Sequence, residues 1–150
     1  IILGLPSSGF HSNGYSLINK ILDIDAPNEL LKKLLIPTKI YVKEVMELLE
    51  VCEIKGMAHV TGGGFEENLS RINDNFTMNI DKTKWNMPQV FKEIQSLGNI
   101  EEDEMFKVFN CGIGYVLILS KESASKAIEI NQNLIEIGFV TKESNKFKFI

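Results

Sequence analysis

Three short loops that combine glycine with small polar residues constrain the fold of this chain more than any other feature. They span residues 7–14, 61–64 and 110–114. The first two each follow an apolar segment, 1–5 and 57–60, and each precedes a segment with the apolar spacing of a helix. Strand, glycine loop and helix in succession predict an α+β or α/β layered domain in which strands alternate with helices.

Apolar periodicity predicts the remaining elements. Helices are expected from residue 15, over 28–35, 39–52, 88–97 and 101–108, from residue 65, and from 120 along to 135. Strands are expected at 115–119, at 77–81 as an exposed strand, and as a closing hairpin of 139–141 and 147–150 around Ser144 and Asn145. Ser12 or Asn13 is expected to cap the first helix, and Gly138 to end the last one.

Composition excludes several classes of protein. The 150 residues fit one domain, 1–150, and the net charge of −4 disfavours a nucleic-acid partner, which would select for a basic patch. No apolar run approaches the roughly 18 residues of a membrane span, and no signal peptide is visible. Two cysteines, Cys52 and Cys111, make no disulfide framework, which predicts a reducing, cytoplasmic compartment.

The two histidines and two distant cysteines show no metal-ligand spacing, so no metal site is expected in this chain. The sequence begins at Ile1, without methionine and already inside an apolar run. We therefore expect these residues to be part of a longer protein.

The glycine loops have a functional and a purely structural interpretation. Glycine lets the backbone approach a phosphate closely and adopt positive φ, and Ser8, Ser12 and Thr61 add hydroxyl groups. A glycine-rich segment after a strand is more often only a turn. No Gly-Lys-Ser/Thr sequence ends any of the three loops, so none is a nucleotide-binding P-loop.

Four other features have two interpretations each. His11 lies in a polar loop, which predicts a solvent-facing side chain that is catalytic or binds a ligand. His59, within an apolar strand, is either a core histidine or a second such group. Cys111 is a nucleophile or, since no base is identifiable, a small buried side chain. The acidic run 101–104 binds a cation or, as we favour, forms the solvated first turn of a helix.

Five collinear blocks of sequence resemble the C-terminal domain of the aminoimidazole ribonucleotide synthetase family. They lie at 4–17, 37–42, 58–68, 98–106 and 109–114. Single elements such as Gly-Gly-Gly are common, but the ordered set is specific. The resemblance implies a mixed β-sheet flanked by helices, partly like a ferredoxin fold.

The resemblance also implies a reaction. The family converts formylglycinamidine ribonucleotide and ATP into aminoimidazole ribonucleotide, ADP and phosphate, in purine biosynthesis. ATP activates the formyl amide oxygen, and an amidine nitrogen then attacks that carbon and closes the imidazole ring. ATP and Mg²⁺ are expected to bind mainly to an N-terminal domain that is absent from this sequence. The full-length protein is expected to be a homodimer, and the isolated domain to be inactive.

The resemblance assigns roles to residues of the three loops. Expected contacts with substrate or phosphate come from Ser8, Gly9, Ser12, Asn13, Thr61, Gly62, Gly63, Gly64, Asn110 and Gly112. His11 and His59 are the candidates for handling the proton.

Two alternatives stay open. The chain could belong to another enzyme of the same superfamily, namely selenophosphate synthetase, thiamine monophosphate kinase or the hydrogenase-maturation type. The block Ser-Gly-Phe-His-Ser-Asn-Gly at 8–14 favours the synthetase over these. The second alternative is a non-catalytic module that binds a phosphate ligand.

Overall fold

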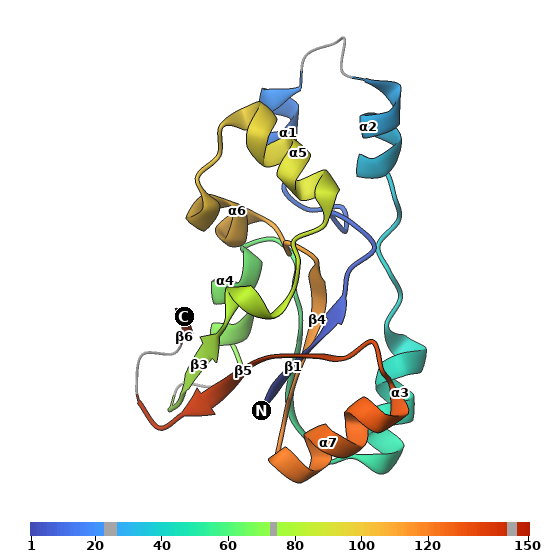
Figure 1. The fold of residues 1–150 in the computed structure, drawn as a ribbon, viewed down its shortest axis with the longest axis vertical. Coiled ribbons are helices and arrows are strands. Elements are labelled where there is room, and N and C mark those ends of the chain that lie inside the picture. Colours follow the sequence, from blue (N-terminus) through green and yellow to red (C-terminus); the bar gives the residue numbers. More distant parts are fainter. Residues whose placement is uncertain (23–26, 73–74, 144–146) are drawn as a thin grey trace.

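A computed structural model describes residues 1–22, 27–72, 75–143 and 147–150 and shows a mixed six-stranded sheet flanked by helices (Figure 1). The strands are β1 (Ile2–Pro6), β2 (Ile54–His59), β3 (Thr77–Ile80), β4 (Ile113–Leu119), β5 (Ile135–Thr141) and β6 (Phe147–Phe149). The helices are α1 (Tyr15–Ile21), α2 (Asn28–Leu34), α3 (Val42–Val51), α4 (Gly64–Ser70), α5 (Gln89–Gly98), α6 (Glu102–Val108) and α7 (Lys121–Ile130), with a 3₁₀ turn at Lys82–Lys84. The predicted α+β class is confirmed.

The sheet has the order β2-β4-β1-β5-β3-β6. Its pairs are antiparallel except for β3 and β6, which run parallel. Strands β1 and β4 therefore lie inside the sheet, and β2 forms one edge. That edge position leaves β2 beside the candidate site described below.

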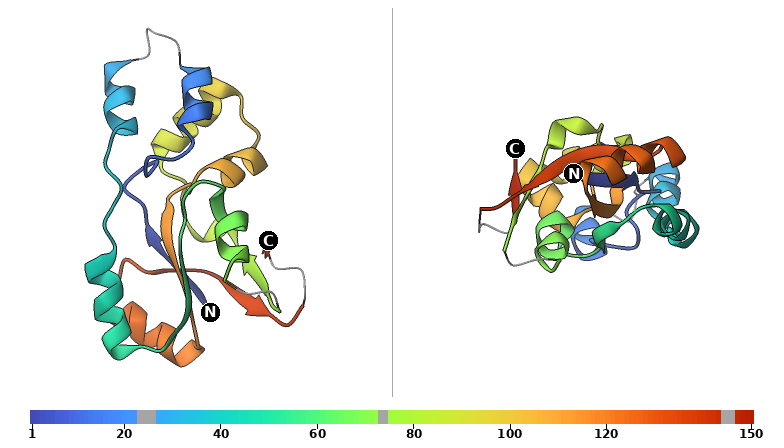
Figure 2. Two further views of the ribbon diagram at one scale, coloured as in Figure 1. Left: turned by 180° about the vertical axis from the view of Figure 1, so that it is seen from behind. Right: turned by 90° about the horizontal axis from the view of Figure 1, so that it is seen from below.

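Alternation along the central strands divides the core between the two faces of the sheet. Leu3 and Leu5 of β1 pack with the buried side chains of α3 and α7, whereas Ile2 packs in the larger cluster on the other face. Seen from the front and from behind, α3 and α7 gather at one end of the molecule and α1, α2 and α5 at the other (Figures 1 and 2). No helix within the described ranges is long and apolar enough to cross a membrane.

Two predictions about the C-terminal strands are wrong. Strand β3 is fully buried rather than exposed, because β5 and β6 flank it on both sides. The predicted hairpin is absent, since β6 pairs with β3 and not with β5. Phe147 and Phe149 pack against the larger core cluster, which explains why this segment adds to the sheet edge there. The predicted turn residues Ser144 and Asn145 lie outside the described residues.

The predicted helix boundaries also need correction. Helix α7 ends at Ile130, where Asn131 turns extended, and the apolar residues from Ile135 onward belong to β5. Gly138 does not end a helix but lies within β5, where a Cβ would collide with the backbone of Asn79. Neither Ser12 nor Asn13 caps α1, because the residue before the helix is Gly14 and no side chain caps it.

Candidate functional site

The three glycine loops converge in space. Ser7 donates its backbone N–H to the carbonyl of Gly112 (2.8 Å), and the Asn110 side chain donates to the carbonyl of Gly9 (2.8 Å). A Cβ placed on Gly62 would lie 3.5 Å from the side-chain oxygen of Asn13. We call the combined surface of residues 7–14, 61–64 and 110–114 the loop junction. It brings together most of the site residues that the sequence predicts.

Asn68 of α4 holds the second loop in place. Its amide nitrogen donates to the carbonyls of Gly64 (2.7 Å), Gly62 (3.2 Å) and Thr61 (3.4 Å), and its oxygen accepts the Thr61 hydroxyl (3.2 Å). The side chain is buried, so these bonds are shielded from water. Sequence reasoning did not assign a role to Asn68, although its place one helical turn after Gly64 was a usable signal.

This clamp fixes the direction of the loop. With the carbonyls drawn toward Asn68, the N–H groups of Gly62 and Gly63 keep no acceptor within the described part of the chain. Gly63 and Gly64 adopt φ of 87° and 58°, which disfavour any residue with a side chain. A Cβ on Gly64 would also collide with the carbonyl of Phe106. Here glycine is required by both conformation and close approach.

Asn110 supports the first loop from below. Besides its bond to Gly9, its side-chain oxygen accepts the backbone N–H of Gly112 (2.9 Å). Gly112 has φ 107°, and a Cβ there would lie 2.5 Å from Pro88. Asn110 is 2% exposed, so in this structure its side chain links the 7–14 and 110–114 loops from inside the domain.

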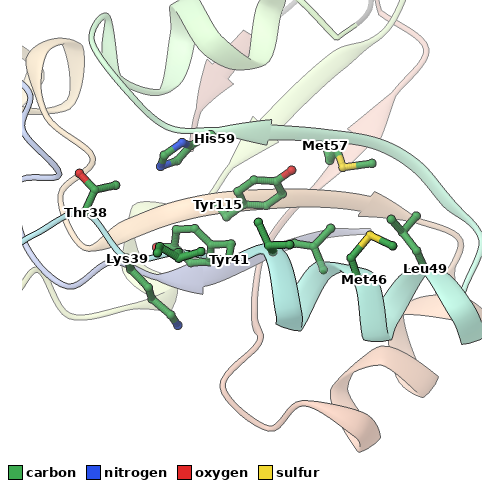
Figure 3. A pocket seen from close by; sticks show the side chains of 11 residues that line it. Thr38, Lys39, Tyr41, Met46, Leu49, Met57, His59 and Tyr115 are labelled. Atoms are coloured by element: carbon green, nitrogen blue, oxygen red, sulfur yellow. The ribbon is translucent and has the colours of Figure 1, made fainter.

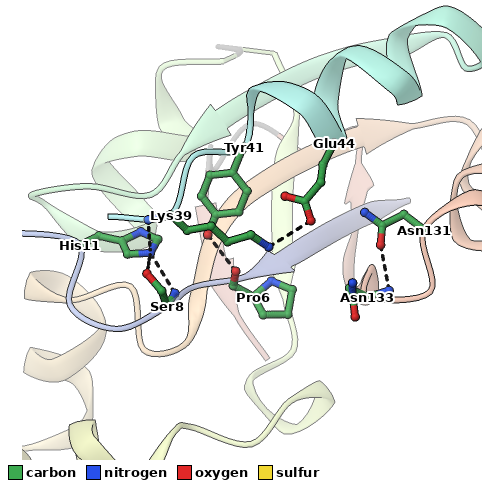
Figure 4. Close-up of polar contacts among 8 residues, drawn as sticks. All are labelled: Pro6, Ser8, His11, Lys39, Tyr41, Glu44, Asn131 and Asn133. Atoms are coloured by element: carbon green, nitrogen blue, oxygen red, sulfur yellow. Dashed lines mark hydrogen bonds and ion pairs between the residues drawn. The ribbon is translucent and has the colours of Figure 1, made fainter. Parts of the chain in front are cut away.

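The prediction that His11 faces solvent is wrong, because its side chain is only 2% exposed. Its Nε2 accepts the backbone N–H of Ser8 (3.0 Å) and lies 3.4 Å from the backbone nitrogen of Lys39 (Figure 4). Burial, then the neighbouring charges of His59 and Lys39, lower the pKa of His11 to about 4. The imidazole is therefore neutral at pH 7, and the hydrogen-bond pattern assigns its proton to Nδ1.

His11 belongs to a cluster of four rings, which we call the ring cluster: His11, Tyr41, His59 and Tyr115. The His11 and His59 ring centres are 5.8 Å apart, and Tyr41 lies 5.9 Å from His11 and 5.7 Å from His59. The Tyr41 hydroxyl donates to the carbonyl of Pro6 (2.8 Å), and burial raises its pKa. Gly114 makes room for the cluster, since a Cβ there would collide with the Tyr41 hydroxyl and with His11.

His59 is partly buried, and desolvation lowers its pKa. Three buried polar atoms have no hydrogen-bond partner among the described residues: Ser7 Oγ, His11 Nδ1 and His59 Nε2. Unsatisfied buried groups are uncommon in folded proteins and often mark functional sites. Two of the three belong to the ring cluster.

A groove of about 540 Å³ opens beside the ring cluster (Figure 3). Side chains of α3 and of the edge strand β2 face each other across Tyr115. The residues that line it include Tyr41, Met46, Leu49, Met57, His59 and Tyr115. Tyr41 and Tyr115 were missed as site residues, because only the sheet register places Tyr115 opposite His59.

The other candidate groups are structural. Cys111 is fully buried, and burial raises the pKa of its thiol, so it is not a reactive thiolate. Both cysteines are free. The acidic residues at 101–104 are exposed, and Lys82 pairs with Glu102 (2.5 Å) and Asp103 (3.5 Å). Across the described ranges, no three His, Cys, Asp or Glu side chains group as a metal site would require.

These features define an α+β domain whose glycine loops meet beside a buried ring cluster and an open apolar groove. The sequence profile of the family described as AIR synthase related protein, C-terminal domain, matches residues 1–149. The chain belongs to this family. The resemblance seen in the sequence blocks is thereby confirmed.

Curated relatives share much of the sequence. The phosphoribosylformylglycinamidine cyclo-ligase of Clostridium botulinum strain Langeland is 46% identical over 100% of this chain, which spans 48% of that relative. The cyclo-ligase of Cupriavidus metallidurans is 47% identical over 85% of the chain and 39% of its own length. The chain thus spans less than half the length of these relatives.

A solved structure of the hydrogenase maturation protein HypE has a similar fold, with a TM-score of 0.59 at 18% identity, covering 97% of this chain and 45% of that one. A second HypE structure, in complex with ATP, matches with a TM-score of 0.58 at 17% identity. At this identity the likeness concerns the fold.

Proposed function

We propose that this chain is the C-terminal domain, residues 1–150, of a phosphoribosylformylglycinamidine cyclo-ligase. The observation that carries the proposal is the 46% identity to the Clostridium botulinum cyclo-ligase along the whole chain. The reaction would join formylglycinamidine ribonucleotide and ATP, close the imidazole ring and release ADP and phosphate. The enzyme would be cytoplasmic and, at full length, a homodimer.

The loop junction is the part of the domain that would bind the anionic substrate. The N–H groups of Gly62 and Gly63, which have no acceptor among the described residues, and the hydroxyl of Ser12 supply donors of the kind that phosphate oxygens accept. The hydroxyls of Ser8 and Thr61 already donate to Pro37 and Asn68, so they would act as acceptors or exchange these bonds for the ligand. The remaining predicted contact residues lie on the same surface or bracket it: Gly9, Asn13, Gly64, Asn110 and Gly112. The loops are held by internal hydrogen bonds, so they would meet the ligand already ordered.

His11 and His59 would handle the proton as neutral imidazoles. Because the pKa of His11 is low, little imidazolium is present at neutral pH to act as a general acid, but a neutral imidazole can still donate a hydrogen bond. In this role His11 Nδ1–H or His59 would stabilise the amide oxygen as negative charge develops there. The unpartnered Nδ1 of His11 and Nε2 of His59 support this assignment.

ATP and Mg²⁺ would be held mainly by the other half of the enzyme. Mg²⁺ prefers carboxylate oxygens beside the ATP phosphates, and the described residues supply no acidic cluster at the loop junction. The residues of this chain therefore fit a phosphate-bearing substrate better than they fit the metal. Bound Mg²⁺ would neutralise charge on the ATP phosphates during transfer.

Turnover of formylglycinamidine ribonucleotide with ATP tests the proposal, using this chain alone and then joined to an N-terminal half. Activity is expected only in the joined protein. A folded joined protein with no activity on this substrate would refute the proposal. Activity with a different substrate of the superfamily would point to the first alternative, and phosphate binding without any turnover to a binding module.

A further inference from the structure

The surface between residues 35 and 57 is unusually apolar. Eight large apolar side chains on it are exposed: Leu35, Ile36, Ile40, Val42, Met46, Leu49, Val51 and Met57. Soluble proteins that act alone rarely expose apolar side chains together in this way. Five of the eight line the groove described above and are therefore grouped: Ile40, Val42, Met46, Leu49 and Met57.

Helix α3 has two apolar stripes. Val45 and Leu48 are buried against the sheet, as expected for a surface helix. Val42, Met46 and Leu49 follow at i, i+4 and i+7 on another side and remain exposed. A helix that covers only its own sheet needs one apolar stripe, and the second stripe indicates a second contact surface.

The opposite wall of the groove is the edge strand β2. Met57 is 40% exposed there and faces α3 across Tyr115 (Figure 3). Lys39 lines the groove and is paired with Glu44 (3.1 Å), so it favours no charged partner. The chemistry of the groove fits an apolar ridge.

We propose that this groove is the docking surface for the other half of the longer protein; the inference rests on the proposed function. The family is described as a C-terminal domain, and the two cyclo-ligases named above are each more than twice the length of the part they share with this chain. A domain in the same polypeptide is present at high effective concentration, so a surface of modest size suffices. Tyr41, His59 and Tyr115 of the ring cluster line the groove, so its occupant also covers one side of that cluster.

Methionine oxidation tests the proposal without any substrate. The 150-residue chain and the longer protein are treated with dilute hydrogen peroxide, and oxidation of each methionine is followed by peptide mass spectrometry. Met46 (54% exposed) and Met57 are expected to oxidise at least tenfold more slowly in the longer protein. Met78 and Met105, at 1% and 0% exposure, are internal controls that stay slow in both.

Equal oxidation of Met46 and Met57 in the two proteins would overturn the proposal. The proposal would also be overturned if Met46 and Met57 of the 150-residue chain alone became protected as its concentration rises, because the occupant of the groove would then be a second copy of the chain. A longer protein that protects both methionines but has no turnover would leave the docking surface intact and refute the proposed function only.

Two matched variants of the longer protein sharpen the test. Met46→Glu is expected to return Met57 oxidation to the rate of the isolated chain, whereas Leu97→Glu, at a similarly exposed position on α5 (59% against 54%), leaves it slow. If Met78 becomes reactive in Met46→Glu, the variant is unfolded and Val42→Glu, at 66% exposure, takes its place. Continued protection of Met57 in a folded groove variant would overturn the proposal.

Discussion

Replacement of Asn68 by alanine removes the side chain that sets the direction of the 61–64 loop. Asn68 contributes three donor contacts and one acceptor contact, and no other described side chain reaches all of these loop atoms. We expect the loop carbonyls to turn and the N–H groups of Gly62 and Gly63 to lose their common direction. The variant should therefore weaken both the fold and the phosphate site.

The size of the effect follows from the contacts. The bonds to Gly64, Gly62 and the Thr61 hydroxyl have good lengths, between 2.7 and 3.2 Å, whereas the contact at 3.4 Å is weak. At about 1 kcal/mol for each well-formed bond, the free energy of unfolding should fall by about 3 kcal/mol. Loss of the ordered N–H pair should lower phosphate affinity by about tenfold, which corresponds to about 1.4 kcal/mol.

Urea unfolding followed by circular dichroism measures the first quantity, and titration of inorganic phosphate followed by the Gly62 and Gly63 amide NMR signals measures the second. Asn133→Ala is the control, since Asn133 is exposed and its side chain bonds to nothing in the described chain. We expect that control to change stability by less than about 0.5 kcal/mol. A folded Asn68→Ala protein with unchanged stability and unchanged Gly62 and Gly63 shifts would refute the role of Asn68.

Three further predictions concern the glycines and His11. The pKa of His11 is about 4 in the folded protein, against an ordinary value of 6.5, so between these two pH values the folded state binds fewer protons than the unfolded state. The free energy of unfolding should therefore be highest above pH 6.5 and fall by up to about 3 kcal/mol as the pH drops to 4. Urea titrations at several pH values should show a smaller fall for His11→Gln. Gly114→Ala should lower the melting temperature clearly because of the collision with Tyr41, whereas Gly62→Ala, whose Cβ would lie at an ordinary contact distance of 3.5 Å from Asn13, should change it little. Gly63→Val should abolish phosphate-induced NMR shifts while the far-UV spectrum is retained; unchanged phosphate affinity would contradict it.

The sequence predicted which segments form helices and strands better than it predicted which strands pair with each other. The segments 1–5 and 115–119 have continuous apolar runs, and both are buried strands of the sheet centre. The segment 147–150 was assigned to a hairpin because it is the next strand along the chain, yet it pairs with β3. Pairing depends on where Phe147 and Phe149 find buried surface, and such long-range packing leaves no local signal.

The candidate site was predicted as a set of loops but not as a geometry. Glycine and small polar residues marked the loops correctly, and the structure brings all three together. The polarity of the neighbouring residues predicted an exposed His11, but its ring is buried beside Tyr41 and His59, and two backbone N–H groups approach its Nε2. Such a partner for a ring nitrogen comes from distant backbone, here at Lys39, and no spacing rule reveals it.

The two parts of the site differ in how complete they are within this chain. Asn68, Asn110 and His11 hold the loops of the loop junction in place through hydrogen bonds inside the domain, so the shape of the loops does not depend on a partner. The groove beside Tyr115 has no such closure and leaves Met46 and Met57 in solvent. It follows that the isolated chain should retain measurable affinity for phosphate while lacking turnover. An isolated chain that is folded yet shows no phosphate-induced shifts would mean that the other half orders the loops as well, and that the internal hydrogen bonds are insufficient.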